Sequence, residues 1–194
     1  MKKILIIAIF SVANLNAKHD KTWDALNAKE RQEYINIKQQ LGSYVAACGG
    51  NATEEQLVQY LKKIGTSIAK NFLHNCTKIR SILDDAEKLS DSGKGKEALV
   101  KIDSAIAVDR TYGNAWAARG DVNFSLGNYV QCISDYSTAI SIFSPIPPYT
   151  GILYTQRALA YQSMGNMNGF KSDILMAASF GNAEAQQVKI AQGW

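Results

Sequence analysis

The side chains that could carry out nucleophilic or acid–base chemistry are few in this sequence. Its 194 residues include two histidines, His19 and His74, and three cysteines, Cys48, Cys76 and Cys132. A Cys–His nucleophilic pair would need an oriented base beside the thiol. His74 is near Cys76 but has no carboxylate within helical reach. The absence of CxxC and CxxCH also argues against a thioredoxin-like redox pair and haem attachment.

Two further segments contain residue types that bind ligands elsewhere. The segment 93–96 (GKGK) superficially resembles a phosphate-binding loop, but neither GxxxxGK[ST] nor GxGxxG occurs in the chain. An acidic run of Asp84, Asp85, Glu87 and Asp91 lacks the loop spacing of a calcium site and is typical of a solvated helix face. We therefore predict no catalytic residue, no metal site and no cofactor, and we expect a protein that is not an enzyme.

The elements that position these residues belong to a globular chain. Hydrophobic residues make up 46% and charged residues 20% of the sequence, which excludes a disordered tail or a fibre. Three prolines and 14 glycines argue against collagen-like chains and many-turned all-β folds. The length allows one domain, or one domain with an appendage.

The N-terminus has the form of a secretory signal peptide, residues 1–17. Two lysines precede an apolar stretch of about ten residues, which is too short to span a bilayer as a helix. Cleavage fits after Ala17, before a polar segment, or after Ala13; the alternative is an uncleaved anchor helix. Cleavage after Ala17 removes two lysines and no acid, so the net charge falls from +4 to +2. This is too near neutral to indicate nucleic acid or an anionic membrane as a partner.

We therefore predict a periplasmic or secreted protein with no stable membrane anchor after cleavage. Export would place the cysteines where disulfides persist. Cys48 and Cys76 each lie at a predicted helix end, and antiparallel helices could bring them together, so we predict a Cys48–Cys76 disulfide. The alternative is two buried thiols, because free cysteine is commonly buried as a small hydrophobe. Sequons at Asn51, Asn75 and Asn123 are interpreted as chance occurrences beside such a bacterial-style signal.

Residues 18–78 are predicted to form an N-terminal helical hairpin. Apolar residues recur at three- and four-residue steps from Trp23 to Val45, which predicts a helix to about Ala47, stopped by Gly49-Gly50. The segment 53–56 (TEEQ) has the form of a capping box. The apolar face of a second helix follows, from Leu57 to Phe72. No stretch of this region has the period of a strand.

Residues 79–194 contain an internal repeat. A shift of 34 residues superposes Gly93 on Gly127 and Ala105 on Ala139. A shift of 38 carries Gly127 to Gly165 and Ala139 to Ala177, and the four extra residues fall in the proline-containing segment 144–150, where adjacent prolines cannot sit in a helix interior. Periods of this length indicate stacked helical repeats.

The segment 115–144 resembles a tetratricopeptide (TPR) repeat, a 34-residue helix–turn–helix unit. The matching residues have aromatic, small or turn-forming side chains at the family's spacing: Trp116, Gly120, Gly127, Tyr129, Cys132, Tyr136 and Ala139. The flanking units match less well, and Phe170 occupies a position where the family has a small residue. The resemblance implies an all-α TPR solenoid of about three repeats, a hairpin over its N-terminal end and a C-terminal capping helix from Gly181 onward.

In TPR arrays the first helix of each repeat lines a concave groove, so the resemblance also implies a binding surface. Carried onto this sequence, the groove positions include Leu83, Glu87, Asp91, Asn114, Ala117, Asp121, Phe124, Thr155, Leu159 and Gln162. The Lys and Asn residues with which some TPR grooves clamp a terminal carboxylate are absent. The acidic and apolar residues present favour a partner segment that carries basic and apolar side chains.

We conclude from the sequence that the chain is a non-catalytic scaffold or adaptor of the bacterial cell envelope, which binds another protein or peptide through the concave TPR groove. The alternative is a secreted or periplasmic protein whose N-terminal module, residues 18–78, carries a ligand-binding or enzymatic activity, with the repeats as a docking platform. The sequence makes no prediction of oligomeric state.

Overall fold

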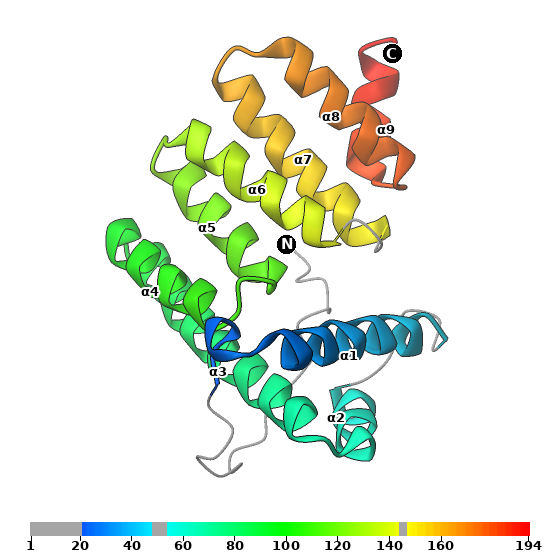
Figure 1. Cartoon of the computed structure of the whole chain (residues 1–194). Helices are drawn as coiled ribbons and strands as arrows, with labels where there is room; N and C mark the ends of the chain where they lie inside the picture. Colours follow the sequence, from blue (N-terminus) through cyan, green and yellow to red (C-terminus); the bar gives the residue numbers. More distant parts are fainter. Residues whose placement is uncertain (1–20, 48–53, 144–146) are drawn as a thin grey trace. The chain divides into compact units, whose positions relative to one another are not determined.

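The computed structural model describes residues 21–47, 54–143 and 147–194, with side chains over 21–41, 56–143 and 149–194. Figure 1 shows that this described part is all-α. Its elements, in chain order, are the short 3-10 helix η2 (Trp23–Ala25) and the α-helices α1 (Ala28–Ala47), α2 (Glu54–Ile64), α3 (Ser67–Asp91), α4 (Gly95–Val108), α5 (Gly113–Ser125), α6 (Tyr129–Phe143), α7 (Pro147–Ser163), α8 (Met167–Ser179) and α9 (Ala183–Ala191).

The chain divides into two compact units. The first reaches Ser81 and includes Ala107–Asp109, and the second comprises Ile82–Ile106 and Arg110–Trp194. The predicted boundary between residues 78 and 79 falls inside α3, which continues without a break from Ser67 to Asp91.

In the first unit, α1 begins at a capping box that the sequence analysis did not identify. The Asn27 side chain accepts a hydrogen bond from the backbone N–H of Glu30, and the Glu30 carboxylate accepts one from the backbone N–H of Asn27. This reciprocal pair satisfies two backbone donors that a helix start leaves free. The helix then buries Tyr34, Ile37 and Leu41, as the predicted periodicity requires.

Two buried asparagines of α3 hold the backbone of Lys21. The Lys21 N–H donates to Asn71 Oδ1 at 2.9 Å, and the Lys21 carbonyl accepts from the side-chain amides of Asn71 and Asn75, both at 2.9 Å. Both asparagines are almost fully buried, and these bonds compensate for the lost hydration of the Asn71 side chain and of the Asn75 amide nitrogen. The segment that enters α1 is therefore attached to α3 by its backbone.

A glycine separates α2 from α3, a break that the apolar periodicity did not reveal. Gly65 has φ = +71°, a left-handed conformation that glycine adopts without strain. The Thr66 hydroxyl accepts a hydrogen bond from the Ala69 N–H at the start of α3. The predicted second helix of the hairpin is thus two helices, and Cys76 lies in the interior of α3 instead of at a helix end.

In the second unit, each helix from α5 to α9 packs against the next one along the chain. The turn between α5 and α6 ends on Gly127, where φ = +75°. The N–H groups of Gly127 and Asn128 donate to the carbonyls of Phe124 and Asn123, which closes the end of α5. Gly93 and Gly165 occupy the corresponding turns with similar backbone angles.

The small residues of the repeat allow close helix packing, as predicted. A Cβ atom at Gly120 would lie 3.1 Å from the Tyr136 ring, so a larger residue there would displace this ring. Cys132, Tyr136 and Ala139 of α6 are 0–2% exposed and form one hydrophobic cluster with residues of α5 and α7. These contacts give the helix–turn–helix pairs a continuous core.

An arginine links successive pairs in a recurring arrangement. Arg119 of α5 donates to Asp135 of α6 and also to Asp103 of α4, both at 2.8 Å. Arg157 of α7 repeats the pattern: it bonds to both carboxylate oxygens of Asp173 on α8 and, at 2.8 Å, to the Ser137 hydroxyl on α6. The two sets are related by the repeat shifts of 38 and 34 residues. Arg119 stacks over Trp116, and Arg157 stacks over Tyr154.

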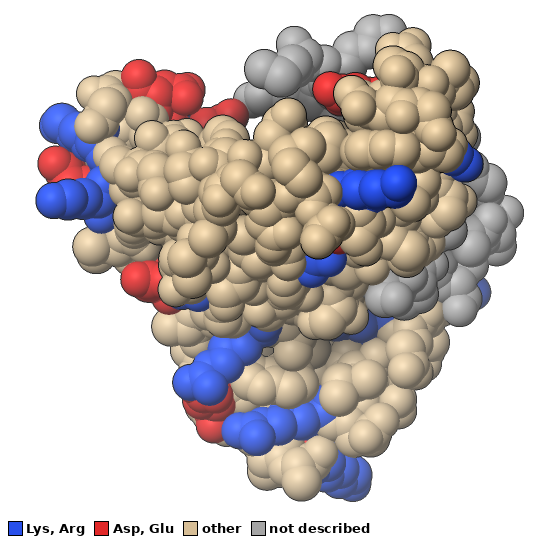
Figure 2. All heavy atoms as spheres, turned by 90° about the horizontal axis from the view of Figure 1, so that it is seen from above, with Lys and Arg blue, Asp and Glu red and all other residues tan. Residues whose placement is uncertain are grey.

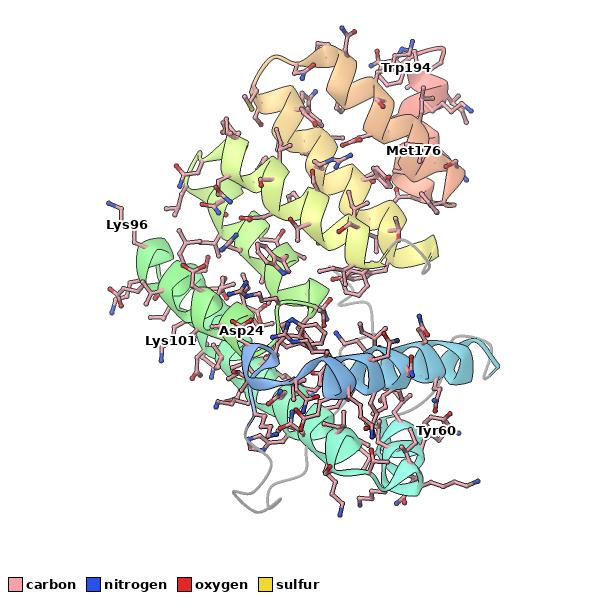
Figure 3. The ribbon with its side chains drawn as sticks, viewed as in Figure 1. Asp24, Tyr60, Lys96, Lys101, Met176 and Trp194 are labelled. Carbon is pink, nitrogen blue, oxygen red and sulfur yellow. The ribbon has the colours of Figure 1, made fainter. Side chains whose placement is uncertain are left out.

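The C-terminal helix α9 covers the last repeat pair. The Asn182 side chain caps α9 by accepting from the Ala185 N–H. Phe170, which departs from the family's small residue, is buried in a regular helix and contacts the Trp194 ring edge to face at 5.8 Å. Figure 3 labels Trp194 beyond the end of α9. The larger residue is thus accommodated because α9 and Trp194 provide an apolar surface for it.

Candidate functional site

The first unit contains a polar cluster around the buried side chains of Tyr34 and Asp109. The hydroxyl of Tyr34 donates to Asp109 Oδ2 at 2.9 Å, and Lys38 Nζ lies 3.3 Å from the same atom. Cys76 is buried nearby, and burial raises the pKa of its thiol far above the usual value. Burial, and then the Asp109 charge, also raise the pKa of Tyr34. A thiol that remains protonated is a poor nucleophile, so this cluster gives no support to catalysis by Cys76.

The structure describes two of the three cysteines, Cys76 and Cys132. Cys76 and Cys132 are both free, buried thiols, and burial raises the pKa of Cys132 to about 12. The other half of the predicted Cys48–Cys76 disulfide, Cys48, lies outside the described residues, so the structure does not support the bridge. The predicted signal peptide, residues 1–17, lies wholly outside the described residues, and the predicted capping box at 53–56 lies partly outside them.

Two of the three sequons are inaccessible in the folded protein. Asn75 is 1% exposed and Asn123 is 3% exposed. The Asn123 amide donates to Asp135 and its carbonyl oxygen accepts from Asn128. Glycosylation needs an exposed acceptor asparagine, so neither residue is an acceptor in the folded state. Asn51 lies outside the described residues.

Within the described residues, no group of three or more His, Cys, Asp and Glu side chains is placed to hold a metal ion. None of the described helices combines the length and apolar character that a membrane span requires.

The predicted groove residues of the first repeat lie on the C-terminal half of α3, in the second unit. Leu83 is partly buried, whereas Glu87 and Asp91 are exposed. The neighbouring exposed acid Asp85 pairs with Lys88 at 3.1 Å. This stretch is a solvated, charged helix face.

The predicted residues of the second repeat share one face of α5, at spacings of three and four residues. We call Asn114, Ala117, Asp121 and Phe124 the α5 face. Asn114 and Phe124 are partly buried, Asp121 is exposed, and Ala117 is 6% exposed and belongs to the core cluster below. Ala117 thus contributes to the core, and the other three residues contribute to the surface of this face.

The predicted residues of the third repeat lie on α7 and differ in accessibility. Thr155 is 5% exposed, and its hydroxyl donates to the Gly151 carbonyl. Leu159 and Gln162 are exposed. Leu159 and Gln162 can thus contact a partner directly, whereas the Thr155 hydroxyl is already used within the helix.

Two tyrosine hydroxyls from other helices reach the α5 face, and the sequence analysis did not assign them a role there. Tyr136 of α6 passes beneath Gly120 and donates a hydrogen bond to Asp121 Oδ1. Tyr149 of α7 donates to Asn114 Oδ1 at 2.8 Å. The sequence carried a signal for the Tyr136 contact: a tyrosine that packs against Gly120 can reach Asp121, the next residue along α5.

Electrostatics set Asp121 apart from the other carboxylates of the array. Desolvation by the surrounding protein raises its pKa above the usual value, and the hydrogen bond from Tyr136 acts in the opposite direction. The residue as a whole is exposed, while the protein around its carboxyl group removes part of the water that would otherwise hydrate it. Burial, together with the Asp121 charge, raises the pKa of Tyr149 to about 12. Both tyrosines remain neutral donors at physiological pH.

The stretch of chain that contains the α5 face carries few charges. Residues 111–170 contain only Arg119, Asp121, Asp135 and Arg157 as charged side chains. Figure 2 shows one face of the molecule on which uncharged residues cover most of the surface nearest the viewer. By contrast, α4 carries exposed charges, and Figure 3 shows Lys96 and Lys101 extending away from it.

The comparisons with known proteins bear on the fold. No protein-family model matches the chain, and no curated protein matches it. Among solved structures, the N-terminal domain of stress-induced protein-1 (STI-1) from C. elegans is similar, with a TM-score of 0.53 over 57% of this chain and 90% of that chain. The fold is a TPR-like helical repeat. At 13% sequence identity the likeness concerns the fold alone, and it agrees with the helix pairs and small-residue packing described above.

Proposed function

We propose that this protein is a non-catalytic adaptor that binds a segment of another protein through the helices that open its repeats, α3, α5 and α7. The observation that carries the proposal is the α5 face. It presents an amide and a carboxylate, each hydrogen-bonded to a tyrosine, and an aromatic ring on one helix. A preorganised surface of this kind loses little conformational entropy when a partner binds.

The composition of this surface supports a partner segment with apolar and basic side chains. Phe124 and Leu159 offer apolar area, and Glu87, Asp91 and Asp121 offer negative charge on the same set of helices. Burial raises the pKa of the Cys76 and Cys132 thiols, which disfavours both as nucleophiles. Protein binding is therefore favoured over catalysis as the activity of the chain.

We further propose that the protein acts in the bacterial cell envelope, either in the periplasm or outside the cell. This setting rests on the form of residues 1–17, with two lysines, a short apolar stretch and small residues before either cleavage point. Its partner would then be another exported or envelope protein.

The proposal is tested by chemical crosslinking in intact cells, followed by capture of the tagged protein. The wild type is compared with a Glu87→Lys, Asp121→Lys double variant, and with a Glu97→Lys, Glu184→Lys control of equal charge change on α4 and α9. Circular dichroism establishes that all three are equally helical. We expect specific partners that the double variant loses and the control retains. Partners that persist in the double variant would contradict the assignment to these helices.

A further inference from the structure

One charge in the middle of the array has no counterion among the residues that the structure describes. Of the four charged residues within 111–170, Arg119 pairs with Asp135 at 2.8 Å and Arg157 pairs with Asp173 at 2.7 Å. Asp121 forms no ion pair with any residue that the structure describes, and its one hydrogen-bond donor is the neutral hydroxyl of Tyr136. Arg119, Asp135 and Arg157 are thus neutralised by ion pairs within the array. The Asp121 carboxylate is left to pair with a partner's cation.

The geometry of this carboxylate suits an incoming cation. Tyr136 bonds to Oδ1, which fixes the carboxylate and leaves Oδ2 without a partner among the described residues. The raised pKa of Asp121 reflects the loss of water around it. In such surroundings a charge-assisted hydrogen bond is stronger than it would be in open solvent.

The neighbours of Asp121 indicate an organic cation rather than a metal ion. A calcium ion requires six to eight oxygen ligands, and no metal-binding group of side chains is present in the described part of the chain. Phe124 lies one helical turn away and packs against Tyr129 with ring centroids 5.5 Å apart. Aromatic rings beside a carboxylate favour lysine and arginine, because the cation and its methylene chain both find partners.

We propose, on the basis of the function proposed above, that Asp121 is the subsite that receives a lysine or arginine side chain of the partner segment. Tyr136 is a positioning residue, which holds the carboxylate. Asn114 and Tyr149 form a second, neutral contact point seven residues earlier on α5, about 10 Å away at the helical rise per residue. An extended segment covers this distance in about three residues, so the partner places a hydrogen-bonding group about three residues from its cation.

The experiment uses random linear peptides displayed on phage and selected on the purified chain. We expect enriched peptides to carry Lys or Arg next to an apolar residue. In a selected peptide, replacement of the lysine by norleucine should weaken binding about tenfold to the wild type. The same replacement should have almost no effect on binding to Asp121→Asn. Glu97→Gln, which removes a charge from α4, serves as the matched control and should discriminate as the wild type does.

The possible failures are distinguishable. If no peptide is enriched on the wild type, the proposed binding function and this inference both fail. If peptides are enriched but lack a basic residue, or if Asp121→Asn discriminates lysine from norleucine as the wild type does, the subsite assignment alone is overturned. Tyr136→Phe provides a further readout: it should reduce the discrimination between lysine and norleucine while leaving affinity for the norleucine peptide unchanged.

Discussion

Asp121 and Asp135 lie on adjacent helices and have opposite environments. Asp135 is fully buried and accepts hydrogen bonds from Arg119, Gln131 and Asn123. The Asp121 carboxylate accepts one hydrogen bond, from Tyr136, and the residue as a whole is exposed. The first carboxylate is compensated within the protein and serves its packing, whereas the second retains unused binding capacity. This difference is what separates a structural acid from a candidate binding acid.

The raised pKa of Asp121 leads to a prediction about stability and pH. A carboxyl whose pKa is higher in the folded state stabilises the fold in its protonated form, and this stabilisation is lost as the pH rises through the raised pKa. Asparagine resembles the protonated acid. We therefore expect Asp121→Asn to melt at a higher temperature than the wild type near neutral pH, with the difference shrinking as the pH is lowered towards the acid range.

The measurement is thermal unfolding followed by circular dichroism over a series of pH values. The titratable groups that face Asp121 are Tyr136 and Cys132 on α6 and Tyr149 on α7, and each has a raised pKa. They stay protonated across this range and leave Asp121 as the group that titrates. A difference in melting temperature that is constant with pH would contradict the assignment.

At the scale of the helices, much of the fold follows from patterns that are local in sequence. Apolar residues at three- and four-residue steps predict the helix faces, and the glycines at 93, 127 and 165 predict the turns. The link through Arg119 was missed because its two partners lie 16 residues away on either side. A signal existed, since Arg157 and Asp173 recur at the repeat spacing. In the first repeat, Asp85 occupies the position of Arg119 and Lys101 occupies that of Asp135. The acidic and basic residues are therefore exchanged there.

The site was only partly predictable for a related reason. Family spacing identifies which residues of α5 and α7 face the same way, because it depends on helical geometry alone. It does not reveal that Thr155 bonds to its own helix, or that hydroxyls from α6 and α7 reach the α5 face. The Thr155 bond depends on the rotamer of that side chain, and the reach of the two hydroxyls depends on how neighbouring helices pack.

The helix-linking ion pairs differ in burial, which predicts unequal contributions to stability. Asp135 has a 1% exposed side chain, whereas that of Asp103, the other partner of Arg119, is 58% exposed. Removing one member of a buried pair leaves an uncompensated charge and costs about 3–5 kcal/mol. Removing an exposed partner costs about 0–1 kcal/mol.

We therefore expect Asp135→Ala to lower the free energy of unfolding by about 3–5 kcal/mol, and Asp103→Ala, the matched control, by about 1 kcal/mol or less. Urea unfolding followed by circular dichroism measures both. Equal losses for the two variants would show that Asp135 does not carry the link between α5 and α6.

The C-terminal contact of α9 also leads to a prediction. Trp194 is partly exposed and covers Phe170, and Lys171 lies over its ring at 5.0 Å. Trp194→Ala should lower the free energy of unfolding by roughly 1–3 kcal/mol, less than the loss for a fully buried tryptophan. Trp194→Phe should recover most of it in the same urea titration. A loss that phenylalanine does not reduce would mean that the ring contact with Phe170 is not the cause.

At the scale of the whole molecule, charge is distributed unevenly along the chain. The stretch 111–170 has four charged residues among its sixty positions, although charged residues make up 20% of the sequence. A surface so poor in charge exerts little long-range attraction on a partner. We therefore expect salt to change the association rate little and to weaken binding mainly through the short-range contact between the partner's cation and Asp121.

The export proposal also concerns the whole chain. Cleavage after Ala17 would leave a mature N-terminus at Lys18, three residues before Lys21, whose backbone is held by Asn71 and Asn75. We expect the protein released by osmotic shock to have an intact mass that corresponds to loss of residues 1–17 or 1–13. Recovery of the full-length chain from the membrane fraction would contradict cleavage and support an uncleaved anchor.

The arginine bridge has a consequence for how such a chain can change over evolutionary time. Each arginine bonds forward to an acid in its own repeat and backward to a short polar side chain in the preceding one. An in-frame duplication of one repeat would therefore supply both partners to the new arginine, at positions set by the same spacing. The array can therefore lengthen by gene duplication without new substitutions at the contacts between repeats. Each added repeat would extend the surface next to the α5 face.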